Sequence, residues 1–263
     1  MEAMVRLGVF LGIFLLMAVW ELFRPKRSLG LERRRRWQVN LGLAVLNVGV
    51  MRLSIGAAAW LAAHWAAEQH LGLFNLLSVP RWLSIALSLL LLDLAIYAQH
   101  IAAHRWRWFW RLHQVHHSDM DFDTTTALRF HPLEIMLSML YKVALVVLLG
   151  ADPLAVIAFE VILNGCALFN HGNVSLPPAV ERWLRYLLVT PDMHRIHHSA
   201  FQAETDSNYG FSLSCWDRLF KTHCPQAREA QSVMMIGLSE FRDSTKLNFV
   251  DLLTLPFRGS RLS

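Results

Sequence analysis

Histidine is the residue type whose spacing could do chemistry in this chain, because ten of its thirteen histidines fall between positions 100 and 198. One pair follows the pattern HxxxH, and two triplets follow HxxHH. Residues three and four apart share one face of a helix, so both imidazoles of the pair can reach one ion, and the three of each triplet lie on one side of a helix. The groups are His100 and His104, then His113, His116 and His117, and finally His194, His197 and His198.

These eight histidines, with His171 as a ninth candidate and His131 as a tenth, are too many for one ion. They suit two metals that keep positions open for water or oxygen. Imidazole binds iron, copper, nickel and zinc. Structural zinc prefers closed sites with cysteine ligands, which Cys166, Cys215 and Cys224 do not provide at their spacing. An all-histidine site is compatible with two open-sided ferrous ions that bind and reduce dioxygen.

The composition indicates a membrane protein. Hydrophobic residues make up 54% of the chain and charged residues 17%, below the roughly 25% of soluble domains, and the mean hydropathy is +0.33. Apolar runs long enough to cross a bilayer predict three spans and a hairpin that turns near the far face. We therefore expect an all-α polytopic fold with about four to five transmembrane helices, from the runs 4–23, 38–66, 82–98, 133–149 and 154–169.

A basic segment sets the expected orientation. Seven cations lie between positions 24 and 36 with only Glu32 opposing them, which is typical of a cytoplasmic loop. A nucleic-acid site is less favoured because the segment lies between two apolar runs. Crossings counted from this loop place the N-terminus outside, as a retained anchor rather than a signal peptide, and the C-terminus inside. All candidate ligands then share the cytoplasmic face.

We expect one membrane-embedded domain over 1–263. Residues 1–80 would hold the N-terminal spans, 90–223 the catalytic core, and 224–263 a cytoplasmic or interfacial tail. The segments after 171 are more polar and would form a helical cap that holds the metal site. Within the tail, 247–253 is expected to form an interfacial helix.

Four polar residues are candidates for supporting the ligands. Asp93 and Tyr97 continue the helical face of His100, and an acid inside a span is costly and usually functional. Asp93 would accept the second N–H of a ligand imidazole, or else pair with another helix. Asn208 and Asp217 are expected to be scaffold rather than ligands. We also expect Glu134 to cap its helix or brace His131, and His64, His70 and His223 to be interfacial or surface residues.

The motifs as a set resemble the fatty acid hydroxylase and sterol desaturase superfamily of membrane di-iron enzymes. The match covers roughly residues 90–223 and departs from many relatives at Ile101 and Lys221, which bears on the substrate rather than the metal. The matching stretches are HIAAH at 100–104, HQVHHS at 113–118, FHPLE at 130–134, NHGN at 170–173, TPDMHRIHHS at 190–199, NYG at 208–210 and WDRLF at 216–220.

The resemblance implies oxygen-dependent hydroxylation or desaturation of a membrane lipid. It implies two iron ions, with zinc as a substitute, and O2 as co-substrate. The chain has no GxGxxG fingerprint and no room for a haem or flavin domain, so electrons would come from a ferredoxin or a cytochrome b5-like protein with a reductase. The cations at 24–36 and Lys221 are candidate docking surfaces. The ligands implied are His100, His104, His113, His116, His117, His131, His171, His194, His197 and His198.

Two other classes of function remain open at this point. A metal transporter or metal-binding membrane protein would spread its ligands along a path across the bilayer or over a floppy histidine-rich loop. A zinc-dependent membrane hydrolase would need fewer histidines and a carboxylate base, and the chain has no HExxH motif. The substrate itself, whether fatty acyl chain, sterol, carotenoid, ether lipid or aminolipid, does not follow from the sequence.

Overall fold

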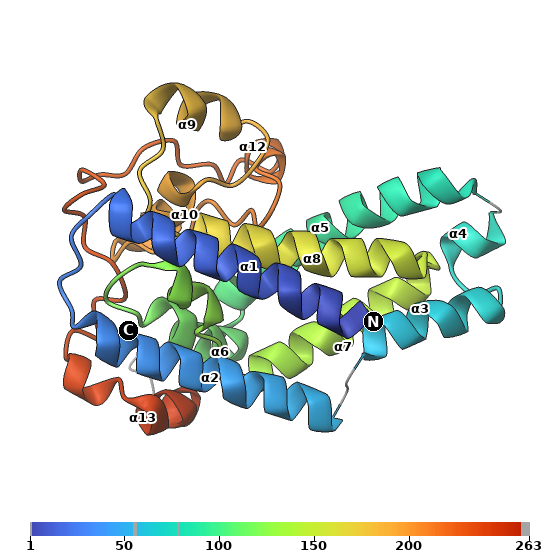
Figure 1. Cartoon of the computed structure of the whole chain (residues 1–263), viewed down its shortest axis with the longest axis horizontal. Coiled ribbons are helices and arrows are strands. Elements are labelled where there is room, and N and C mark those ends of the chain that lie inside the picture. Colours follow the sequence, from blue (N-terminus) through green and yellow to red (C-terminus); the bar gives the residue numbers. More distant parts are fainter. Residues whose placement is uncertain (1, 55–56, 78, 259–263) are drawn as a thin grey trace.

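The structure is a computed structural model that describes residues 2–54, 57–77 and 79–258, and within these ranges its regular elements are helices, with isolated β-bridges but no strand (Figure 1). Five of its helical segments are long and apolar enough to cross a membrane. The predicted all-α membrane fold is therefore confirmed. The helices that carry these segments are α1 (Glu2–Phe23), α2 (Arg33–Ser54), α5 (Arg81–Arg105), α7 (Pro132–Leu149) and α8 (Pro153–Asn170).

The second predicted span, 38–66, is divided between two helices. The 22 residues of α2 rise about 33 Å, whereas the 11 residues of α3 (Ala58–Glu68) rise only about 17 Å. The helix α3 packs against α7 and α8 and is followed by the short α4 (Leu73–Leu76). At this end of the bundle, a Cβ on Gly72 would lie 2.2 Å from the backbone nitrogen of Gly150, so this turn requires glycine.

The hairpin of α7 and α8 follows from local signals. Each helix begins with proline directly after a residue whose side chain accepts a backbone N–H, His131 before α7 and Asp152 before α8. Gly150 ends α7 in the left-handed conformation, with a φ of 64°. The charged residues of these spans are paired, because Lys142 lies 2.6 Å from Glu160, which also binds Arg6 of α1.

A cap covers the other end of the bundle, at the left of the view in Figure 1. It is built mainly from residues 171–258, and the chain enters it first through α6 and η1. The C-terminal helix α13 packs against α2, where Leu252 and Leu43 are both fully buried in one apolar cluster. The cap elements are α6 (Arg107–His117), η1 (Thr124–Leu128), α9 (Pro178–Leu184), α10 (Pro191–His197), α11 (Gln202–Thr205), α12 (Cys215–Leu219), η2 (Ser244–Lys246), α13 (Phe249–Thr254) and η3 (Leu255–Phe257).

Candidate metal centre

Nine histidines, all with buried side chains, meet where the bundle joins the cap, in two groups. Within each group, every residue offers one ring nitrogen, and these atoms lie within 4.8 Å of one another. The described part of the chain has no other cluster of three or more potential ligands with this geometry. The groups are a five-histidine group of His100, His104, His113, His117 and His197, and a four-histidine group of His116, His171, His194 and His198.

Each HxxHH triplet is divided between the two groups, although its three histidines lie on one side of their helix. In α6, His113 and His117 enter the five-histidine group and His116 enters the other. The triplet of α10 does the reverse, with His197 in the five-histidine group. Successive helical residues point about 100° apart, so neighbours such as His116 and His117 diverge towards two positions.

Oxygen acceptors fix the orientation of four of the rings through Nδ1. The Nδ1 of His113 lies 2.6 Å from a carboxylate oxygen of Glu134. The other three acceptors are backbone carbonyls: His100 faces that of Tyr209 at 2.8 Å, His171 that of Ala167 at 2.8 Å, and His197 that of Ser207 at 2.7 Å. An oxygen acceptor places the ring proton on Nδ1 and leaves Nε2 as the lone-pair nitrogen, which is the arrangement of a metal-binding imidazole.

The remaining ring nitrogens fit a bound metal. The Nε2 atoms of His100, His113 and His197 are buried without a hydrogen-bond partner, which is rare unless an ion or water satisfies the group. The Nε2 of His171 lies 3.1 Å from that of His116 and 3.0 Å from that of His194. Two metal–imidazole bonds of about 2.1 Å at a right angle would place their nitrogens about 3.0 Å apart.

Burial also sets the charge of these imidazoles. Desolvation lowers the pKa of His171 to about 4 and that of His197 to about 3. It also lowers the pKa of His116, His194 and His198 well below the ordinary value, with repulsion from neighbouring histidines as the next cause. The rings are therefore neutral at neutral pH and can bind a metal without first losing a proton.

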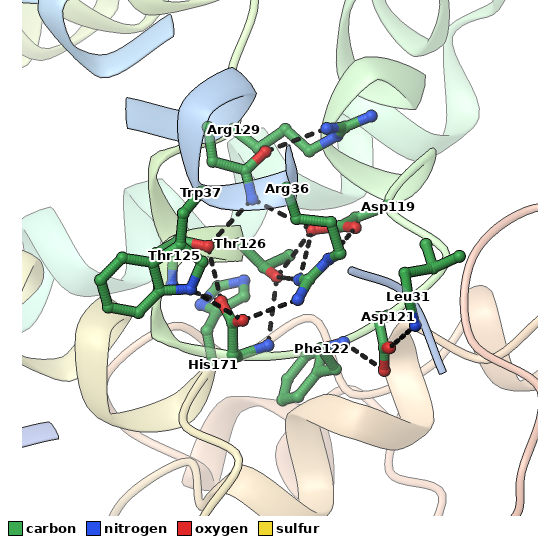
Figure 2. Close-up of polar contacts among 12 residues, drawn as sticks. Leu31, Arg36, Trp37, Asp119, Asp121, Phe122, Thr125, Thr126, Arg129 and His171 are labelled. Atoms are coloured by element: carbon green, nitrogen blue, oxygen red, sulfur yellow. Dashed lines mark hydrogen bonds and ion pairs between the residues drawn. The ribbon is translucent and has the colours of Figure 1, made fainter. Parts of the chain in front are cut away.

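A buried ionic network holds the end of α6 that carries His116 and His117 (Figure 2). Arg36 of α2 binds Asp119 with nitrogen–oxygen distances of 2.8 and 2.9 Å, and its Nη1 lies 2.6 Å from Asp123. Burial alone would raise the pKa of Asp119, but Arg36 lowers it below its ordinary range. Arg129 donates to the carbonyl of Val115 at 3.0 Å, which places a cation at the carboxyl end of α6.

Aromatic rings surround the histidines and were not singled out from the sequence. Tyr209 is fully buried, and its ring centroid lies 5.1 Å from that of His104 and 5.6 Å from that of His197. Phe130 stacks on His116 at 4.3 Å. The motif NYG was the only sequence signal for Tyr209, and these rings exclude water from the site.

Asp93 and Tyr97 do not contact a candidate ligand through hydrogen bonds. Asp93 accepts hydrogen bonds from the indole of Trp216 at 2.8 Å and from the backbone N–H of Leu213. It therefore pairs with another element, the second of the two expected roles. The hydroxyl of Tyr97 bonds to that of Thr222 at 2.7 Å. Both residues attach α5 to the cap.

Asp217 acts on the site through the backbone, and Asn208 holds the cap together. The carboxylate of Asp217 accepts from the N–H groups of Tyr209 and Gly210 at 2.7 and 2.8 Å, and the carbonyl of Tyr209 in turn faces His100. Asn208 has a φ of 50° and bonds to the backbone of Met193 and Cys224. Neither residue belongs to a histidine group.

His131 lies outside both histidine groups and caps α7. Its Nδ1 accepts the N–H of Leu133 at 3.2 Å, its Nε2 lies 3.2 Å from the carbonyl of Leu253, and it belongs to neither histidine group. Glu134 braces His113 rather than His131. Both ring nitrogens of His131 are thus engaged at the start of α7 and at the C-terminal segment.

The basic segment 24–36 is largely paired within the protein, which weakens its role as a docking surface. Lys26 binds Asp192 at 2.7 Å, and Arg33 binds Glu21 at 3.0 Å. Arg36 is buried in the network above, and Arg27 faces Asp121 at 3.9 Å. Exposed cations remain at Arg24, Arg34 and Arg35.

The sequence is similar to several known proteins whose names describe hydroxylation or oxygenation of lipids. The chain is 26% identical to the ornithine lipid hydroxylase OlsE of Rhizobium tropici over 87% of this chain and 70% of the relative. It is 33% identical to the alkylglycerol monooxygenase of Homo sapiens over 49% of this chain, and 25% identical to the cholesterol 25-hydroxylase of Rattus norvegicus over 60%. The matched segment spans only 28% of the human protein and 53% of the rat protein. No solved structure is significantly similar.

A family model, described as fatty acid hydroxylase, matches residues 85–222. This segment is more than half of the chain and contains every member of both histidine groups. It also agrees with the resemblance found in the motifs. The chain therefore belongs to the fatty acid hydroxylase family.

Proposed function

We propose that this protein is a membrane-bound oxygenase that hydroxylates a lipid at a dinuclear iron centre held by the two histidine groups. The observation that carries the proposal is the convergence of nine buried imidazoles into groups of five and four at one end of a membrane bundle. A single ion could not use nine ligands. A transporter would distribute its ligands along the spans, so this clustering counts against that alternative.

Iron, when bound, would supply the activation of dioxygen for insertion into a C–H bond. The protein would supply ligands of fixed orientation, because Glu134 and the carbonyls of Tyr209 and Ser207 each bind one ring through Nδ1. The aromatic rings around the histidines would keep water away from the reacting atoms. An all-histidine centre brings no ligand charge, so the nearby Glu134 carboxylate would offset part of the charge of the metal.

A lipid substrate is supported by the relatives, which are named for an ornithine lipid, an alkylglycerol and cholesterol. Ornithine lipid is the first candidate, because that relative aligns over most of this chain. The substrate would approach from the bilayer, since the histidines lie where the spans meet the cap. Hydroxylation is favoured over desaturation because these three relatives are hydroxylases or monooxygenases by name.

Electrons would come from a separate carrier, a ferredoxin or a cytochrome b5-like protein with its reductase. The cations at 24–36 favour a cytoplasmic position for the loop between α1 and α2. That loop lies at the cap end of the bundle (Figure 1). The proposal therefore places the metal centre on the cytoplasmic face, where such carriers are reduced.

Lipid mass spectrometry of cells with and without the gene tests this function. Wild type should add the mass of one oxygen atom to a lipid, and His116→Ala should abolish the change. The matched control is His131→Asn, which removes an imidazole but keeps a capping side chain, and it should behave as wild type. Anaerobically purified protein should hold two irons per chain. One zinc per chain with no oxygen insertion would overturn the proposal and favour the hydrolase.

A further inference from the structure

A groove of about 530 Å³ runs between α1 and α2, apart from the histidine groups. Its walls are apolar along most of its length, with Leu15, Ala18 and Val19 on α1 and Leu41 on α2. Both helices belong to segments that are long and apolar enough to cross a membrane, so the groove would face lipid. Nothing in the oxygenase proposal uses this groove.

The cap end of the groove is cationic. Arg33 and Arg34 line it, and no acidic residue does. Arg33 is engaged, because it binds Glu21 at 3.0 Å and lies 4.7 Å from the ring centre of Trp37. Arg34 is exposed and, within the described residues, makes no hydrogen bond or ion pair. The groove thus joins an apolar channel to one guanidinium that is available to a ligand.

The rigid wall of the groove is Trp37. Its indole nitrogen donates to Asp123 at 3.2 Å, and its ring contacts Phe14 of α1 with 5.8 Å between centroids. These contacts fix the ring of Trp37 against α1 and against the segment before η1. Because the ring of Trp37 is held in place, the groove stays open and can bind an extended hydrocarbon chain.

We propose that this groove binds an acidic phospholipid. One acyl chain would lie between α1 and α2, and the phosphate would bind Arg34 where α2 leaves the membrane. Hydrocarbon matches the apolar walls, and a net anionic headgroup matches a cationic rim without an acid. A zwitterionic headgroup carries a cation beside its phosphate, so its attraction to the guanidinium of Arg34 would be weaker.

Lipid retention by the purified full-length protein tests this proposal. The protein is placed in nanodiscs of phosphatidylcholine with a minor fraction of phosphatidylglycerol, and the lipids that remain after release into mild detergent are counted by native mass spectrometry. Wild type should retain phosphatidylglycerol in excess of its fraction. Arg34→Gln should reduce that excess about fivefold, the effect of one cation near an anionic surface. Arg24→Gln, an exposed cation outside the groove, is the matched control.

A second variant tests the groove rather than the charge. Ala18→Phe would fill the channel with a ring and should lower retention of both lipids while Arg34 is intact. Unchanged iron content and melting temperature would show that the variants are folded. The proposal is overturned if wild type retains the two lipids in proportion to their supply, if neither variant changes retention, or if a second copy of the chain occupies the groove as a stable dimer. The outcome does not depend on the oxygenase activity.

Discussion

Replacing Glu134 by alanine should weaken metal binding by about 10- to 100-fold although no ligand is removed. Glu134 and His113 are 5% and 3% exposed, and their carboxylate oxygen and Nδ1 are 2.6 Å apart. Without the carboxylate, a buried N–H would be left unpaired at a cost of about 1–3 kcal/mol, and the ring could turn or change tautomer. Loss of such a partner typically costs 10- to 100-fold in metal affinity, or about 1.4–2.7 kcal/mol.

The assay is anaerobic titration of ferrous iron into the metal-free protein in detergent, with a competing chelator. Glu134→Gln keeps an acceptor of the same shape without the charge, so its affinity should lie between those of wild type and Glu134→Ala. His113→Ala should lose more than either. The reasoning fails if Glu134→Ala binds iron as tightly as wild type. Thermal unfolding of the metal-free proteins separates a loss of affinity from a loss of fold.

Three further perturbations follow from the structure. Arg36→Met should lower the free energy of unfolding by about 3–5 kcal/mol, because it strands two buried carboxylates, and an unchanged melting temperature would contradict this. Gly210→Ala should destabilise the cap, since a Cβ there would lie 2.6 Å from a carboxylate oxygen, whereas Gly49→Ala meets nothing within 4 Å and should not. Below pH 6.5 the unfolded chain protonates its histidines before the folded chain does, because burial lowers the pKa of His171 to about 4 and of His197 to about 3. The free energy of unfolding of the metal-free protein should therefore fall by roughly 1.5 kcal/mol per such group between pH 6.5 and pH 5, and a flat profile by chemical denaturation would refute it.

Elements with local signals were predictable. The hairpin was expected at 133–149 and 154–169 and is found at Pro132–Leu149 and Pro153–Asn170, because proline, a capping side chain and apolar length all act within a few residues. The HxxHH triplets were expected on helices because their spacing is helical, and they lie at the ends of α6 and α10. Residues 38–66 were expected to form one span because their hydropathy stays high, and nearly all described residues of this run lie in α2 and α3.

Pairing across the chain was not predictable from spacing. Glu134 was placed near His131 because the two are close in sequence, yet it reaches His113, 21 positions away. Asp93 was expected either to orient a ligand imidazole or to pair with another helix, and its partner is the indole N–H of Trp216, 123 positions on. The partners depend on how α6 packs against α7 and how α5 packs against α12, which one sequence does not specify.

The division of the triplets explains why two HxxHH motifs occur rather than one. In each triplet the first and last histidines, four apart, enter one group, and the middle one enters the other. The two triplets do this in opposite senses, so α6 and α10 each contribute to both groups and hold them side by side. His113→Ala should therefore deplete the metal of the five-histidine group first, and His116→Ala that of the four-histidine group. If two such variants instead lost the same single ion, with the second intact in both, the assignment of the groups to separate metals would be wrong.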